Sequence, residues 1–254
     1  MSDPLATYSF LPWVRQGIAN KITSSGGVRA TVKVELTISG EGSELPVSAN
    51  VTKDVQLIGP GDIVGIEARS IVRTEPRDWI TNFEPNYLPF VEFYDEDFPW
   101  RYTPAAPDGK GRLQPWLTLV VLEEGEFKEV SNAKDRPLPS INVADASQLF
   151  PKTDSLWAWA HVHINRNVLP GPGLASDDMS QVLPKFESVL NENPDLAYSR
   201  LLCPRKLKDN TPYHAFLLPT FESGRMAGLG QDPGSVTSAT QPAWANPGAL
   251  DFPV

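Results

Sequence analysis

The sequence predicts a β-rich α+β fold with mostly antiparallel sheet, long ordered Pro-rich loops and one or two short helices. Residues 28–39 alternate strictly between apolar and polar side chains, the pattern of a strand with one buried face. Short apolar runs rich in β-forming residues follow at 116–124, 156–165 and 214–221, which favours further strands. Proline supplies 25 of 254 residues, about twice the usual share of roughly 5%, and it interrupts helices and central strands.

The first elements are expected around the alternating segment. Val14, Ile18 and Ile22 are four residues apart, which predicts a short helix over 13–22. Residues 28–39 and 47–51 read as the two strands of a hairpin with a long loop. Residues 53–67 predict two more short strands, separated by the Gly-Pro-Gly-Asp turn at 59–62.

Residues 73–115 show no convincing periodicity, and we expect a long ordered loop there. Seven prolines and many aromatic residues lie in this segment. A loop of this length inside a compact domain is usually functional. Its aromatic content also argues against disorder, because disordered segments are poor in aromatics.

The C-terminal half predicts three strands and one clear helix. The strand beginning at Trp116 is strongly apolar and rich in β-forming residues, and it is expected at the centre of a sheet. Residues 125–155 are expected to be loop-like, and 156–165 and 214–221 to be strands. Residues 176–194 predict a helix capped by Ser176 or Asp177, and 222–230 one helical turn. We treat 1–254 as a single β-rich domain in which 230–254 is an extended tail or linker.

Composition narrows the possible partners. The net charge of −9 disfavours nucleic acid, which needs a concentrated positive surface. No apolar run reaches 18 residues, so no transmembrane helix is expected in this segment. The single cysteine, Cys203, rules out an internal disulfide and fits a cytosolic origin. We expect no cofactor.

The sharpest candidate for a metal site is the pair His161 and His163. On a strand, residues two apart share a face, so both imidazoles could reach one ion, with His214 or a carboxylate from 95–97 completing the set. Trp157 and Trp159 would share that face, and no established zinc motif is present. We therefore interpret the histidines as packing or interface residues and expect no metal.

Three features of the sequence are candidate catalytic sites. Asp95, Glu96 and Asp97 could supply an acid–base pair for a glycosidase, but consecutive carboxylates on an extended segment alternate sides. Cys203 needs a histidine beside it to act as a nucleophile, and nothing in the sequence places one there. Ser223 lacks the first glycine of a nucleophile elbow. We therefore predict that the protein is not an enzyme.

The stretch 83–102 holds eight of the 24 aromatic residues, interleaved with carboxylates. Aromatics are enriched in interface cores, and neighbouring carboxylates select a basic partner. We predict a protein interface here, and internal packing of the same rings is the alternative. The interface prediction covers Phe83, Tyr87, Phe90, Phe93, Tyr94, Asp95, Glu96, Asp97, Phe98, Trp100 and Tyr102.

Several long motifs occur in a fixed order: FLPWVRQG, GPGD, IVRTEPRDWITNFEPNYLPFVEFYDEDFPWRYTPA, GRLQPWLTLVVLEEGEF, LWAWAHVHI, SRLLCPRKL and PTFESGRMAGLG. Together they resemble a family of large structural proteins encoded in gene clusters of extracellular contractile injection systems, which are phage-tail-like particles. Members of that family run past this length, so we expect the chain to be the N-terminal part of something longer.

The resemblance implies a structural particle component and supplies no catalytic residues. A cap adaptor at the end of tube and sheath is the first expectation, and a baseplate or plug component the second. A carbohydrate or cell-wall hydrolase using Asp95 and Asp97 is the alternative from another class. The implied partners are copies of the chain in a hexameric ring, and the inner tube, sheath or cap proteins. The particle would assemble in the bacterial cytoplasm and could then be released outside the cell.

Overall fold

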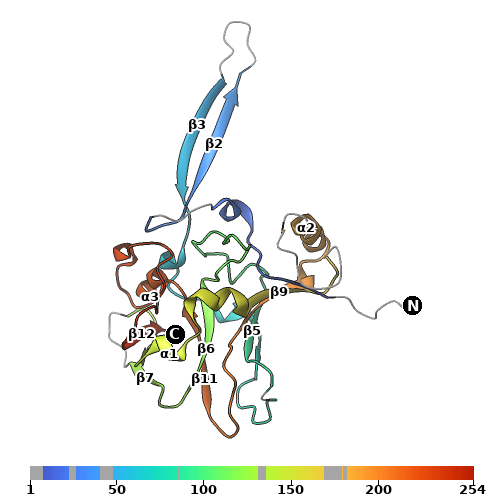
Figure 1. Cartoon of the computed structure of the whole chain (residues 1–254). Helices are drawn as coiled ribbons and strands as arrows, with labels where there is room; N and C mark the ends of the chain where they lie inside the picture. Colours follow the sequence, from blue (N-terminus) through green and yellow to red (C-terminus); the bar gives the residue numbers. More distant parts are fainter. Residues whose placement is uncertain are drawn as a thin grey trace, which may run out of the picture.

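The computed structural model describes residues 8–22, 27–40, 48–84, 86–130, 136–168, 179 and 182–254. The predicted β-rich α+β fold is confirmed in this part of the chain, where all paired strands are antiparallel (Figure 1). The strands are β1 Ser9–Leu11, β2 Thr31–Ser39, β3 Ser48–Gln56, β4 Ile71–Glu75, β5 Phe90–Phe93, β6 Leu117–Glu123, β7 Phe127–Val130, β8 Ser140–Val143, β9 Ala160–Ile164, β10 Ala197–Leu202, β11 Tyr213–Pro219 and β12 Leu250–Pro253.

The helices are short. The α-helices are α1 Ala146–Leu149, α2 Leu183–Glu192 and α3 Glu222–Gly228. The 3₁₀ turns are η1 Gly17–Lys21, η2 Pro60–Asp62, η3 Ala68–Ser70, η4 Thr153–Trp159, η6 Pro194–Leu196 and η7 Pro233–Ser235. None of the helices in the described residues combines the length and apolar character needed to cross a membrane.

The ribbon of β6 and β11 lies at the centre of the body. Leu119 and Val121 of β6 point into one buried cluster, and Val120 and Leu122 point into another. Both faces of the strand are therefore covered, which explains why β6 is mostly apolar. The strand predicted from Trp116 is confirmed as β6. Its expected place at the centre of a sheet is wrong, because among the described residues β6 pairs only with β11.

The larger cluster packs against a five-stranded sheet with the order β1-β9-β10-β5-β4. Its inward residues include Val162 of β9, Leu201 of β10 and Phe93 of β5. The opposite face of this sheet carries aromatic, histidine and arginine side chains. The sheet is thus half-buried, with its polar face turned away from the core.

The second cluster lies against a three-stranded sheet with the order β12-β8-β7. Trp244 and Phe252 are buried in it, and β12 pairs with β8. The expectation of a tail or linker at 230–254 is therefore wrong, because these residues bury large apolar side chains in the core. The expected loop over 125–155 likewise contains β7, β8 and α1, and the loop expected over 73–115 contains the end of β4 and all of β5.

Three local predictions need correction. The helix expected over 13–22 is only the 3₁₀ turn η1, and Ile18 is exposed. The strand over 156–165 begins at Ala160, because Thr153–Trp159 forms η4. Residues 53–56 belong to β3, and 63–67 form no strand beyond the turn at 59–62.

The remaining helix predictions hold in part. The helix expected over 176–194 is described from Leu183, and Pro184 falls in its first turn, where the missing N–H costs nothing. The proposed caps at 176 and 177 lie outside the described residues. The helical turn at 222–230 is the helix α3, and the strand at 214–221 is β11.

Candidate interaction surfaces

A two-stranded hairpin of β2 and β3 stands away from the body of the molecule (Figure 1). Its strands pair from Thr31 opposite Gln56 to Ser39 opposite Ser48, which confirms the predicted hairpin. Directly opposed residues of an antiparallel pair point to the same face, so this register sorts the side chains by polarity. We call one side the apolar hairpin face; it comprises Val32, Val34, Leu36, Ile38, Ala49, Val51, Lys53 and Val55.

The apolar hairpin face is buried only at its root. Val32 is buried and packs with Ile22 and Ala30. Toward the tip, Leu36 is 58% exposed, Ile38 60% and Val51 50%. The alternating pattern predicts a half-buried strand, and for Leu36 and Ile38 that prediction is wrong within this chain. The face has the composition of a buried surface without a cover among the described residues.

This exposure is physically significant because an isolated two-stranded hairpin is marginally stable in water. The strands also have free outer edges, since within the described residues β2 and β3 pair only with each other. An exposed apolar ribbon with open edges is what a partner chain can cover, by face packing or by strand addition.

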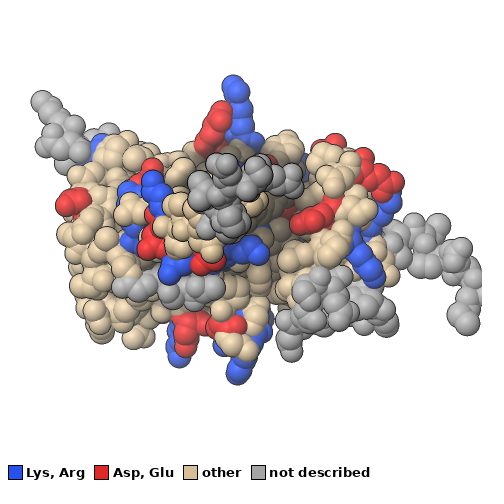
Figure 2. Space-filling model, turned by 90° about the horizontal axis from the view of Figure 1, so that it is seen from above, with Lys and Arg blue, Asp and Glu red and all other residues tan. Residues whose placement is uncertain are grey.

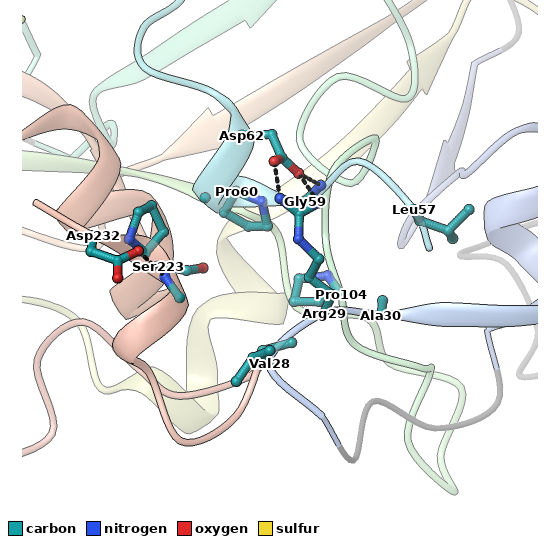
Figure 3. A pocket seen from close by; sticks show the side chains of 14 residues that line it. Val28, Arg29, Ala30, Leu57, Gly59, Pro60, Asp62, Pro104, Ser223 and Asp232 are labelled. Atoms are coloured by element: carbon teal, nitrogen blue, oxygen red, sulfur yellow. Dashed lines mark hydrogen bonds and ion pairs between the residues drawn. The ribbon is translucent and has the colours of Figure 1, made fainter. Parts of the chain in front are cut away.

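The root of the hairpin is fixed to the body by polar contacts (Figure 3). The guanidinium of Arg29 forms a two-pronged ion pair with the Asp62 carboxylate, with Nη1 2.9 Å from Oδ2. The amide of Leu57 donates to the carbonyl of Ala30 at 3.0 Å, and the amide of Ala239 donates to the carbonyl of Gly27 at 2.8 Å. These bonds hold the hairpin base against the turn at 59–62 and the C-terminal segment.

A cleft of about 260 Å³ lies at this root. Its polar side chains are largely occupied, because Arg29 and Asp62 bind each other and Asp232 accepts from the Gly234 amide at 2.8 Å. The hydroxyl-bearing Ser223 is buried at the start of α3 (Figure 3). The volume is below the roughly 300–1,000 Å³ of typical ligand pockets. We interpret the cleft as the joint between hairpin and body.

The structure divides the predicted interface at 83–102. Phe93, Phe98, Trp100 and Asp97 are buried; Phe83, Phe90, Glu96 and Tyr102 are half-buried; Tyr87, Tyr94 and Asp95 are exposed.

The buried rings of this stretch belong to the core of the chain itself. The Phe93 and Phe98 rings stack with centroids 4.7 Å apart. The indole of Trp100 donates to the Leu113 carbonyl at 3.2 Å, and that of Trp116 donates to the Phe98 carbonyl at 2.7 Å. The interface prediction is therefore wrong for Phe93, Asp97, Phe98 and Trp100, which cannot reach a partner without unfolding.

The acidic residues of the stretch are paired, and they do not form a catalytic couple. One guanidinium nitrogen of Arg101, Nη2, lies 2.7 Å from Asp95 and 2.6 Å from Asp97. Glu96 instead accepts a hydrogen bond from Gln16. Burial, with the neighbouring Asp97 and Asp95 charges, raises the pKa of Glu96. The cleft at the hairpin root is not lined by these carboxylates.

The most exposed aromatic side chain lies just before the predicted stretch. Trp79, in the loop between β4 and β5, is 97% exposed, and Ile80 beside it is also exposed. Trp79 could not be selected from the sequence, because a single tryptophan in an aperiodic segment carries no signal of its exposure. With Tyr87 in the same loop, it forms a second apolar surface.

The two histidines of β9 share the outer face of the five-stranded sheet, as predicted. His163 packs edge-on against Phe10, with ring centroids 4.8 Å apart, and stacks on Tyr198 at 4.7 Å. Burial and the nearby Arg200 lower the pKa of His161 to about 4, and they lower the pKa of His163 too. Trp157 is not on this face, because it lies in η4.

The structure places no third metal ligand beside His161 and His163 among the described residues. His214 lies on β11, 3.9 Å from Glu124 and packed against Phe127, in a different sheet from His161 and His163. In the described residues no group of three or more histidine, cysteine or acidic side chains is close enough to hold an ion. Cys203 is buried, and burial raises the pKa of its thiol, so it has the character of a core residue.

Charges of both signs surround the hairpin. Seen along it, basic and acidic side chains are interleaved rather than separated into single-sign areas (Figure 2). Long-range steering by one sign of charge is therefore weak on this face. The choice of partner must rest on apolar area and on individual charge pairs.

Comparisons with known proteins found no match: no family model, no curated protein and no solved structure is similar to this chain.

Proposed function

We propose that the protein is a non-enzymatic assembly component that docks onto a partner chain through the apolar hairpin face. The observation that carries this proposal is the exposure of Leu36, Ile38 and Val51 on a ribbon that projects from the body. Fully burying an aliphatic side chain stabilises by about 1.5–3 kcal/mol. With roughly half of each side chain still open, covering these three adds about 3 kcal/mol per copy.

A gain of this size suits an assembly rather than a lone pair of proteins. Repetition around a ring multiplies modest contacts into a stable structure. The sequence resemblance supports placing the protein in a contractile injection particle that assembles in the bacterial cytoplasm. There it would act as a cap adaptor in a hexameric ring beside tube and sheath, with a baseplate or plug position as the second choice.

The carbohydrate hydrolase alternative receives no support from the described residues. Asp95 and Asp97 share Arg101 as ion-pair partner, and Asp97 is buried. A retaining or inverting glycosidase needs two carboxyl groups facing one sugar site. No observation favours such a site over the docking role.

The proposal is tested by changing the apolar hairpin face alone. Leu36→Thr, Ile38→Thr and Val51→Thr together remove the exposed apolar side chains and keep strand-forming residues. The matched control places threonine at three positions of the opposite face: Lys33→Thr, Glu35→Thr and Asn50→Thr. Both variants are expressed with the whole gene cluster, and the protein content of purified particles is measured by mass spectrometry and electron microscopy.

We expect the apolar-face variant to be missing from particles and the control variant to be incorporated at the wild-type level. Circular dichroism of both purified variants checks that each is folded. Normal incorporation of the folded apolar-face variant would exclude the hairpin as the docking element.

A further inference from the structure

The loop between β4 and β5, residues 76–89, presents a second uncovered apolar surface. Trp79 is 97% exposed, its chain neighbour Ile80 is exposed, and so is Tyr87 further along the same loop. Pro85 lies outside the described residues. We call Trp79, Ile80 and Tyr87 the aromatic loop.

Trp79 is not explained by the folding of this chain. Its φ angle is 62°, a left-handed backbone that costs a non-glycine residue about 1–2 kcal/mol. Its side chain buries almost nothing in return. Backbone strain of this kind concentrates at functional sites, and tryptophan is enriched among the residues that anchor interfaces.

The two apolar surfaces lie at opposite ends of the molecule. The hairpin leaves the body at one end, and the loop joining β4 to β5 lies at the other (Figure 1). A chain with two unlike docking surfaces at its ends assembles head to tail, into a closed ring or an open filament.

The charged residues favour head-to-tail assembly over the packing of two hairpins face to face. The apolar hairpin face carries one charged residue, Lys53, and no carboxylate among its described members. Two such faces packed together would bury Lys53 without an opposite charge, which is costly. The aromatic loop instead carries Asp78 next to Trp79, and Glu84 further on, so it offers a carboxylate beside the indole.

We infer that the aromatic loop of one copy docks on the apolar hairpin face of the next copy, with Trp79 on Leu36, Ile38 and Val51 and with Asp78 paired to Lys53. This inference deepens the proposed function by naming the partner of the hairpin as a second copy of this chain. The exposed apolar area on each side is small compared with the roughly 800 Å² per partner of a standard interface. Association of the purified chain should therefore be micromolar and concentration-dependent.

The test uses two variants that each lose one end. The hairpin variant carries Leu36→Thr, Ile38→Thr and Val51→Thr, and the loop variant carries Trp79→Ser and Ile80→Ser. The purified wild type, each variant alone and the two variants mixed are compared by sedimentation velocity over a range of concentrations. Circular dichroism confirms that both variants are folded.

Head-to-tail docking predicts a specific set of oligomeric states in this experiment. The wild type forms oligomers, each variant alone is monomeric, and the mixture forms only one-to-one dimers. Such dimers arise because one intact loop and one intact hairpin remain in the mixture, and the damaged ends stop further growth. Lys53→Glu should weaken wild-type association about tenfold, and adding Asp78→Lys should restore most of it.

Other outcomes overturn the inference. Self-association of the loop variant alone would show that hairpins pair with hairpins. A wild type that stays monomeric at all concentrations, while the hairpin variant is still lost from particles, would show that the hairpin binds a different protein. That second result would reject the inference and leave the proposed function standing.

Discussion

Acidification should destabilise the protein through the two histidines of β9. His161 lies on the outer face of the five-stranded sheet, packed edge-on against Phe10 with ring centroids 5.4 Å apart. Arg200 on β10 is its direct cross-strand neighbour. Arg200 is paired with Glu92, but its positive charge still acts against protonation of both His161 and His163.

The size of the effect follows from the pKa of His161, which burial lowers from 6.5 to about 4. Above pH 6.5 the ring is neutral in both states and costs nothing. As the pH falls from 6.5 to 4, His161 binds a proton in the unfolded chain but stays mostly neutral in the folded chain. The free energy of unfolding therefore decreases as the pH is lowered. One pKa unit corresponds to about 1.4 kcal/mol, so between pH 7 and pH 4 His161 alone lowers the free energy of unfolding by about 3 kcal/mol.

The assay is urea denaturation at pH 7, 6, 5 and 4, for the wild type and for His161→Gln. The variant should lose less stability on acidification, because its side chain binds no proton in either state. His214→Gln is the matched control; His214 is exposed on β11, in a different sheet, and because this variant keeps His161 it should keep the His161-dependent loss of stability on acidification. Identical pH dependence of the wild type and His161→Gln would refute the reasoning.

Three further changes test the packing of the body and the loop. Trp100→Ala removes a fully buried indole and should lower the free energy of unfolding by about 3–5 kcal/mol in urea titrations; a loss under about 1 kcal/mol would contradict its place in the core. Gly228→Ala would put a Cβ 2.5 Å from Pro253 Cγ, so we expect a loss of about 1–3 kcal/mol and faster amide exchange in β12; unchanged exchange there would argue against that contact. Trp79→Gly should leave the melting temperature of the monomer unchanged or raised, because glycine accepts the left-handed backbone; a clear fall would mean that the indole is packed in the monomer.

The elements that the sequence predicted well are those whose side chains follow one simple rule. β6 is apolar at almost every position because both of its faces are covered. The strand β10 was not predicted from the sequence. Its inward residues Ala197, Ser199 and Leu201 are mostly small, and the large residues Tyr198 and Arg200 point outward. Its burial alternates perfectly, but its hydrophobicity does not.

The candidate site shows a different limit. Phe93, Phe98 and Trp100 form a core, whereas Tyr87 and Trp79 are open to solvent, and all five lie in one proline-rich region. Interface cores and domain cores use the same aromatic residues. Composition could therefore identify the region as one that needs burial, but it could not say which rings the chain itself would cover.

The hairpin follows from the same physics. Hydrophobic alternation indicates which face of a strand is buried in the functional state of the protein. The face can be buried by the same chain or by a partner. At Val32 the shield is the body of this chain; at Leu36 and Ile38 the described residues provide none. A chain that kept this pattern without a partner would carry an exposed apolar ribbon with open edges, a liability for aggregation. At Leu36 and Ile38 the alternation of β2 does not predict the chain's own core. There it instead supports the proposed docking role.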